Sequence, residues 1–136
     1  MAGEIERIET ILRQTRSMAI VGVSADPMRP SHGVWQYLKS ATDYELYLVN
    51  PTLREIDGDA VYPSLADLPV VPDLVDVFRR REHLHSVLRD TIAVGAKTLW
   101  LQQGLADDDI AREGAAAGLQ VVMDRCIKVD HARLLG

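Results

Sequence analysis

The feature that most constrains the fold of this chain is an alternation between short apolar runs and longer segments whose apolar residues recur at helical spacing. The apolar runs cover residues 18–23, 44–49, 74–78, 98–102 and 120–123. A strand that is apolar at every position is covered on both faces, which is typical of a parallel sheet between helical layers. Because strand–helix–strand connections are right-handed, the pattern predicts an α/β fold. We expect a Rossmann-like three-layer domain with a five-stranded parallel sheet in the order 3-2-1-4-5.

The segments between these runs predict the helices and turns. Apolar residues at positions 5, 8, 11 and 12 indicate an amphipathic helix at the start of the chain. Ser31 is expected to cap the next helix. Further helices are expected over 84–94, 107–117 and 129–135, with a helical turn over 65–68. Residues 52–63 are expected to be irregular, with a turn at Asp57-Gly58.

Length, charge and cysteine content restrict the class of protein. The 136 residues suit one domain, and no repeat or linker divides them, so we expect a single domain over residues 1–136. The net charge of −5 argues against nucleic acid as a partner. The apolar runs are far shorter than the roughly 20 residues that cross a bilayer, so no membrane partner is expected. A lone Cys126 and the lack of a secretory signal predict a cytoplasmic protein without disulfides or a bound metal.

In open parallel sheets, ligands bind at the carboxyl ends of the strands, where the strand order reverses. The segments to consider are therefore 22–31, 50–54, 79–81, 102–105 and 124–128. The first of these departs from a nicotinamide-dinucleotide site, because only Gly22 stands where that site has its glycines. The second strand ends in Asn50, not in the carboxylate that binds a ribose.

The first loop nevertheless suits an anion. It leads into a helix N-terminus, whose free N–H groups and partial positive charge attract phosphate. Arg29, Ser31 and His32 are placed where they could add hydrogen-bond donors. The alternative is that Ser31 only caps the helix and Arg29 is only a solvated loop charge.

Several strand-end motifs together resemble the small stand-alone CoA-binding proteins. The motifs are Ile20-Val-Gly-Val-Ser24, Arg29-Pro-Ser-His32, Val49-Asn-Pro51, Val61-Tyr-Pro-Ser-Leu65, Val75-Asp-Val-Phe-Arg-Arg80, Gly95-Ala-Lys97, Leu99-Trp-Leu-Gln102 and Val122-Met-Asp-Arg-Cys126. These proteins are similar in fold to the N-terminal, CoA-binding domain of the succinyl-CoA synthetase α subunit. The resemblance covers residues 17–134. It implies a Rossmann-like fold that binds coenzyme A or an acyl-CoA at the carboxyl edge of the sheet.

The resemblance also implies a set of binding residues. The loop at Gly22 resembles the segment that cradles the CoA phosphates, although the synthetase loop is richer in glycine. The turn after the second strand would border the adenosine, and the loop after the fourth strand would meet the pantetheine arm. Arginines at this edge suit the phosphates. The expected site is Gly22, Val23, Ser24, Arg29, Pro30, Ser31, Asn50, Pro51, Arg54, Arg79, Arg80, Gln102 and Gln103.

No nucleophile, base and orienting group stand together, so we expect a non-catalytic binding module. Cys126 faces the same edge and could pair with the CoA thiol, but a lone cysteine is more often a small core residue. Asp76, inside an apolar strand, is expected to accept hydrogen bonds from a neighbouring loop. The resemblance favours a homodimer. Two alternatives remain open: a nicotinamide-dependent oxidoreductase on this fold, and a structural or regulatory dimer with an empty cleft.

Overall fold

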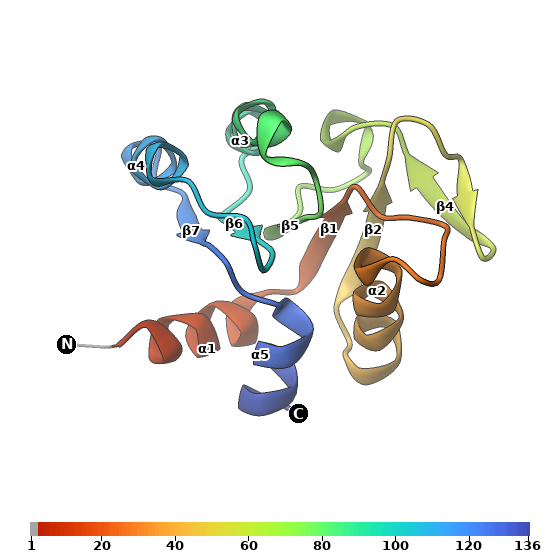
Figure 1. Ribbon diagram of the computed structural model, residues 1–136, viewed down its shortest axis with the longest axis horizontal. Helices are drawn as coiled ribbons and strands as arrows, with labels where there is room; N and C mark the ends of the chain where they lie inside the picture. The colour runs from red at the N-terminus through yellow and green to blue at the C-terminus, as the bar shows by residue number, and fades with distance from the viewer. Residues whose placement is uncertain (1–2) are drawn as a thin grey trace.

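The computed structural model describes residues 3–136, which form a single sheet flanked by helices (Figure 1). The sheet has seven strands in the order β3-β4-β2-β1-β5-β6-β7. The strands are β1 Ser17–Val21, β2 Glu45–Val49, β3 Glu55–Ile56, β4 Asp59–Tyr62, β5 Leu74–Val77, β6 Thr98–Leu101 and β7 Gln120–Val122. All neighbouring strands are parallel except β3 and β4, which form an antiparallel hairpin at one edge.

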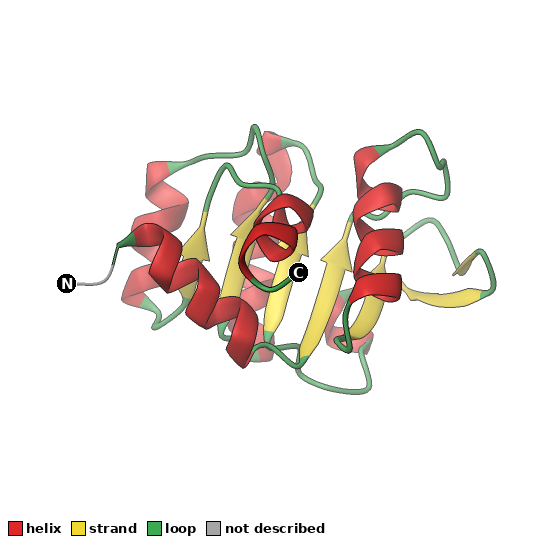
Figure 2. Ribbon diagram, turned by 90° about the horizontal axis from the view of Figure 1, so that it is seen from below, coloured by secondary structure: helices red, strands yellow, loops and turns green. Residues whose placement is uncertain are grey.

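Among residues 3–136, five α-helices cover the two faces of the sheet. They are α1 Glu4–Gln14, α2 Pro30–Ala41, α3 Leu84–Val94, α4 Asp108–Ala116 and α5 Ile127–Leu134. Three of them, α2, α3 and α4, connect strands. Helices α1, α2 and α5 lie on one face and α3 and α4 on the other, as Figures 1 and 2 show. The expected three-layer α/β architecture is therefore confirmed. Within the described residues, no helix is long and apolar enough to cross a membrane.

Alternate residues of each strand enter two separate apolar cores. Met18 and Ile20 of β1 pack with residues of α1, α2 and α5, whereas Ala19 and Val21 pack with residues of α3 and α4. Side chains of a strand alternate between the two faces, so a strand with helices on both sides needs apolar residues throughout. The continuous apolar runs of the sequence follow from this arrangement.

The predicted strand order is wrong at the strand formed by residues 74–77. That strand, β5, lies directly beside β1, where Ile20 is in register with Asp76, and not beyond β2. The position next to β2 belongs to β4, where Val61 pairs with Leu48. Counted along the chain, the six parallel strands have the order 3-2-1-4-5-6, which is that of the dinucleotide-binding Rossmann fold.

The missed strands lie in the segment expected to be irregular. Strand β4 makes only two register pairs with β2 and lies between Pro51 and Pro63, so neither its length nor its flanks suggest a strand. The predicted turn at Asp57-Gly58 is present, and it joins β3 to β4. Both turn residues have positive φ, 51° and 88°, as two-residue hairpin turns require.

Helix ends agree with expectation at some positions and not at others. Gly95 ends α3 with φ of 83°, and Asp107 caps α4 by accepting the N–H groups of Asp109 and Ile110. Ser31 is not a cap: α2 begins at Pro30, and Arg29 is the capping residue, without a side-chain hydrogen bond. Proline suits the first helical position because its missing N–H would have no partner there.

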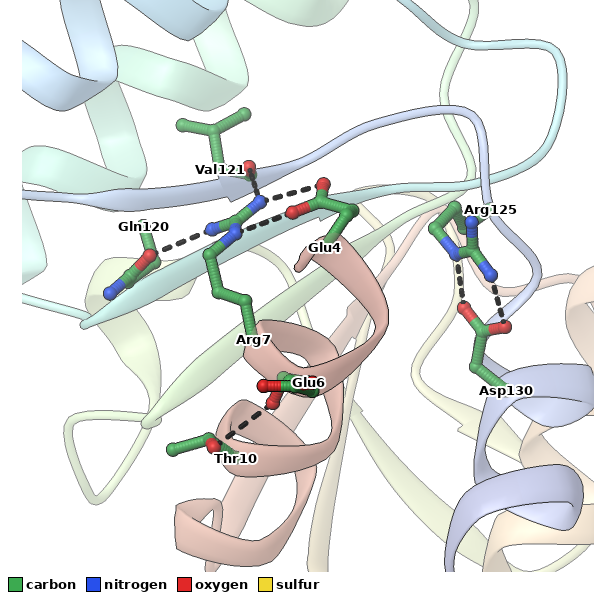
Figure 3. A network of polar contacts seen from close by, with 8 residues as sticks. All are labelled: Glu4, Glu6, Arg7, Thr10, Gln120, Val121, Arg125 and Asp130. Carbon is green, nitrogen blue, oxygen red and sulfur yellow. Dashed lines mark hydrogen bonds and ion pairs between the residues drawn. The ribbon is translucent and has the colours of Figure 1, made fainter. Parts of the chain in front are cut away.

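Arg7 of helix α1 binds to the backbone of β7, which is the edge strand of the sheet (Figure 3). The Arg7 guanidinium forms an ion pair with Glu4 at 2.7 Å and donates to the Val121 carbonyl at 2.9 Å. The backbone N–H of Gln120 donates to the carbonyl of Lys97, the residue before β6. Because successive residues of a strand direct their backbone groups to opposite sides, the carbonyl of Val121 points away from β6, toward the open edge of the sheet. Arg7 therefore donates to a carbonyl group of the edge strand that could otherwise pair with a further strand.

Candidate functional site

A cleft of about 600 Å³ lies at the carboxyl ends of β1, β5 and β6. After β1 the chain passes to α2 on one face of the sheet, and after β5 it passes to α3 on the other. The cleft is therefore at the point where the strand order reverses, which is where ligands bind in such sheets. Its lining residues are Gly22, Ser24, Arg29, Pro30, Ser31, Val34, Phe78, Arg79, Gln102, Gln103, Leu105 and Cys126. We call this the carboxyl-edge cleft.

Two other hollows, of about 670 and 720 Å³, are somewhat larger. Both lie at the amino ends of the strands. Their linings include residues that directly precede strands, such as Arg16 before β1 and Lys97 before β6. Position in the fold, not size, therefore selects the carboxyl-edge cleft as the candidate site.

Gly22 brings the first loop against the end of β5. Its φ is 85°, and a Cβ at this position would lie 2.4 Å from the Phe78 carbonyl oxygen. The backbone N–H of Gly22 donates to the carbonyl of Val49, at the end of β2, at 2.9 Å. The N–H of Phe78 donates to the carbonyl of Val21, at the end of β1, at 2.8 Å. Only glycine fits both the backbone conformation and the close approach.

The first loop is held by side-chain hydrogen bonds to its own backbone. The Ser31 hydroxyl oxygen accepts the N–H of Ser24 at 2.9 Å, and the Ser24 hydroxyl oxygen accepts the N–H of Asp26 at 3.0 Å. From β2, the Asn50 amide donates to the Val23 carbonyl at 2.9 Å. Ser31 is buried, so its role in the free protein is to fix the loop from inside α2.

Two arginines bring positive charge to the carboxyl-edge cleft. Arg29 precedes α2 and Arg79 follows β5, and both line the cleft. Within residues 3–136, neither makes an ion pair with a carboxylate. The N-terminus of α2, a helix of 12 residues, adds partial positive charge beside Arg29. This part of the cleft is therefore suited to an anion.

The opposite side of the cleft comes from the turns after β6 and β7, which are bonded to each other. Asp124 accepts the N–H of Gly104 at 2.7 Å, and the Trp100 indole donates to the Arg125 carbonyl at 2.8 Å. The Arg125 guanidinium binds both carboxylate oxygens of the buried Asp130, at 2.7 and 2.9 Å (Figure 3). Cys126 is thus held in a fixed turn, and the charge of its neighbour Arg125 is directed to Asp130.

A buried acid lies next to the cleft. Asp76 is fully buried in β5, and its Oδ1 accepts a hydrogen bond from the Gln102 side-chain amide, which lines the cleft. Gln102 follows β6, so the expectation that a neighbouring loop donates to Asp76 is confirmed. Burial raises the pKa of Asp76 to about 8, against the smaller lowering effect of the Gln102 hydrogen bond.

The structure brings together most of the residues expected from the sequence. Gly22, Ser24, Arg29, Pro30, Ser31, Arg79, Gln102 and Gln103 line the carboxyl-edge cleft. The other expected residues lie elsewhere. Val23 is fully buried in the core, and Asn50 uses both ends of its amide in hydrogen bonds to Val23 and Thr52. Pro51 lines a smaller hollow, while Arg54 and Arg80 are exposed outside the cleft.

Four lining residues were not among those expected: Val34, Phe78, Leu105 and Cys126. Val34 shows only helical periodicity in the sequence, which is equally typical of a core residue. Phe78 ends the apolar 74–78 run, so in the sequence it has the signature of a buried strand residue and not of a cleft residue. Cys126 lies in the turn after the last strand, and this strand-end position was the signal in the sequence that could have placed it in the cleft.

The sequence matches the family described as "CoA binding domain" over residues 16–132, and the chain belongs to that family. It is 38% identical over 125 residues to the uncharacterized protein YneT of Bacillus subtilis, which covers 92% of each chain. Among solved structures, Prb, the PH1109 protein redesigned for binding, has a TM-score of 0.93 and 35% identity, over 99% of this chain and 94% of that one. The cell-free protein ID.343 of Thermus thermophilus has a TM-score of 0.90 and 33% identity, over 98% and 100%. The predicted family resemblance is therefore confirmed.

Proposed function

We propose that this protein binds coenzyme A or an acyl-CoA in the carboxyl-edge cleft. The observation that carries the proposal is that Arg29 and Arg79, from separate loops, line one cleft without carboxylate partners among residues 3–136. The chain has a net charge of −5 and belongs to the family of CoA-binding domains. A local pair of unneutralised arginines in an acidic protein supports a small, strongly anionic ligand.

The phosphates of CoA suit this part of the cleft. CoA carries a diphosphate and a 3′-phosphate, and the guanidinium group binds phosphate oxygens through two parallel hydrogen bonds. Each such charge-assisted bond contributes roughly 1.5–3 kcal/mol. The first loop, fixed by Ser31 and Asn50, brings its backbone beside the arginines, and Gly22 leaves no side chain at its start.

The two ends of CoA would extend from the arginines in opposite directions. Arg79 also lines a smaller hollow of about 170 Å³ together with Pro51, and we place the adenosine toward this hollow. The cleft is also lined by Val34, Phe78 and Leu105, together with the amide of Gln102. An apolar surface with a few polar groups suits the pantetheine arm.

We further propose binding without catalysis. The described lining of the carboxyl-edge cleft places no histidine or carboxylate beside Cys126, so no base is positioned to activate the thiol. A nicotinamide cofactor is less well supported, because Asn50 stands where a ribose-binding carboxylate would be and its amide is used by Val23 and Thr52. A cytoplasmic homodimer completes the proposal, the location being consistent with the free cysteine Cys126.

A thermal-shift panel tests the choice of ligand. CoA, acetyl-CoA, NAD, NADP and ATP are compared at equal concentration, since a ligand that binds only the folded state raises its stability. At a hundredfold excess over the Kd, the stabilisation amounts to about 2.7 kcal/mol. We expect CoA and acetyl-CoA to raise the melting temperature most. A larger shift with NAD or NADP would favour the oxidoreductase, and no shift with any ligand would favour an empty cleft.

A further inference from the structure

Asp76 occupies a position where the sheet has no need of a carboxyl group. It is in register with Ile20 on β1 and with Trp100 on β6, both fully buried, and the rest of β5 is apolar. Its single hydrogen-bond partner is Gln102, and Oδ2 is the one fully buried side-chain polar atom without a partner among residues 3–136. Placing an acid here is unfavourable compared with valine or leucine. A carboxyl group at this position therefore calls for an explanation beyond packing.

The hydrogen bond to Gln102 connects this acid to the carboxyl-edge cleft. Gln102 is the first residue after β6, and its side-chain N–H₂ group donates to Asp76 Oδ1. Its Oε1 receives no hydrogen bond, yet it is not among the fully buried unpaired atoms of the described chain. Because Gln102 is only 6% exposed and lines the cleft, this oxygen reaches solvent through the cleft.

The direction of this hydrogen bond determines what Gln102 offers a ligand. A glutamine amide has a donating end and an accepting end. Asp76 keeps its proton at neutral pH because burial raises its pKa, and since Oδ1 accepts the N–H₂ group, that proton lies on Oδ2. The carbonyl end of Gln102 is thereby left directed to the cleft. Without an acceptor at position 76, the amide could rotate and present the two ends in turn.

We propose that Asp76 is a positioning residue, which holds Gln102 so that its carbonyl oxygen accepts a hydrogen bond from a ligand N–H group in the carboxyl-edge cleft. The inference rests on the proposed function, under which the donor is an amide N–H of the pantetheine arm of CoA. Asp76 itself does not touch the ligand. The site thereby selects for ligands whose arm carries an amide, independently of the arginines that bind phosphate.

The test separates the amide-bearing arm from the phosphates. Calorimetry compares CoA with adenosine 3′,5′-bisphosphate, which has the 3′-phosphate and the 5′-phosphate of the nucleotide but lacks the pantetheine arm. Asp76→Leu should weaken CoA about five- to tenfold, the effect of losing one oriented hydrogen bond, and leave the bisphosphate within about twofold. Asp76→Asn keeps a carbonyl acceptor and should restore much of the CoA affinity. Thr98→Val, at the far end of β6, removes a buried polar group away from the cleft and should change neither ligand.

A double variant and a measurement on the free protein complete the test. In a Gln102→Leu background, Asp76→Leu should not weaken CoA further, because both substitutions remove the same interaction. By NMR, the Gln102 side-chain amide should exchange slowly with solvent in the wild type. Asp76→Leu, which has no acceptor, should accelerate this exchange, whereas Asp76→Asn should leave it slow. Equal losses for CoA and the bisphosphate, additive effects of the two substitutions, or a rapidly exchanging wild-type amide would overturn the inference. If wild-type protein binds neither CoA nor the bisphosphate while the amide is protected, the proposed function fails and the orientation of Gln102 stands.

Discussion

The carbonyl oxygen of Phe78 lies 2.4 Å from the position that a Cβ of Gly22 would occupy. The start of the first loop therefore lies against the backbone at the end of β5. These two chain segments leave the sheet for opposite faces, and the carboxyl-edge cleft opens between them. The site depends on this contact as well as on the arginines.

Substitution of Gly22 should therefore be costly for the fold. Gly22→Ala combines a Cβ clash with backbone and an unfavourable positive φ of 85°, so we expect a loss of about 2–4 kcal/mol in unfolding free energy. Gly118 is the matched control, because its φ is 83° and a Cβ added there would have no neighbouring atom within 4 Å. Gly118→Ala should cost only about 1 kcal/mol. Urea denaturation of both variants measures the difference, and equal losses would mean that the contact with Phe78 relaxes freely.

The buried acid should make stability depend on pH. In the unfolded chain Asp76 titrates near its ordinary pKa of 3.8, and burial raises the pKa in the fold to about 8. Between these values the folded protein keeps a proton that the unfolded chain has lost, so stability falls as pH rises, by at most about 1.4 kcal/mol per pH unit. Asp76→Asn removes this titration. Its stability relative to wild type should increase from about pH 4 to about pH 8 and then level off.

Urea denaturation of wild type and Asp76→Asn over this range provides the measurement. The difference between the two curves isolates Asp76 from the other titrating groups, which both proteins share. A difference that does not change with pH would show that Asp76 does not carry a raised pKa in the folded protein.

The course of the chain through the sheet was only partly predictable from the sequence. Apolar runs identify strands covered on both faces, and β1, β2, β5, β6 and β7 were all found in this way. Strand order is not encoded in these runs, because any apolar strand can lie beside any other. The order depended on β4, whose pairing with β2 is a tertiary contact of only two residue pairs. The short β3–β4 hairpin left one local signal, the Asp57-Gly58 turn, which was recognised as a turn but not as a hairpin.

The lining of the carboxyl-edge cleft was more predictable than the sheet order, because strand-end positions are local in sequence. Knowing that a residue follows a strand places it at the carboxyl edge whatever the order. Which way its side chain points is a separate matter. Arg79 lines the cleft and Arg80 is exposed, although they are adjacent residues in the loop after β5. Ser31 shows the same limit, since its hydroxyl fixes the first loop and does not cap α2.

Cys126 should be dispensable for CoA binding. Its turn is fixed by backbone and side-chain hydrogen bonds that do not involve the thiol, and Arg125 is paired with Asp130. Affinity should come from the arginines and the buried arm, so Cys126→Ser is expected to change the CoA Kd by less than about threefold, under 1 kcal/mol. Calorimetry gives the Kd, and mass spectrometry of the purified protein provides an independent check. CoA found in disulfide linkage to Cys126 would contradict this account and indicate a thiol-dependent site.

The protein is expected to be a homodimer in solution. Symmetric dimers are the most common oligomers of soluble proteins, and the family resemblance points the same way. Light scattering at high micromolar protein concentration should give the mass of two chains. A monomeric mass under these conditions would remove the dimer from the proposal without affecting the carboxyl-edge cleft.

Titration of CoA into the wild-type protein and into Arg29→Ala, Arg79→Ala and Arg89→Ala variants tests the central claim most directly. Arg89 is an exposed residue of α3 outside the cleft, so its substitution controls for the loss of one positive charge. We predict one CoA per chain for the wild type, a loss of about ten- to a hundredfold in affinity for each cleft variant, and little change for Arg89→Ala. No measurable binding to the wild type, or equal affinities in all four proteins, would contradict the assignment of the carboxyl-edge cleft as a CoA site.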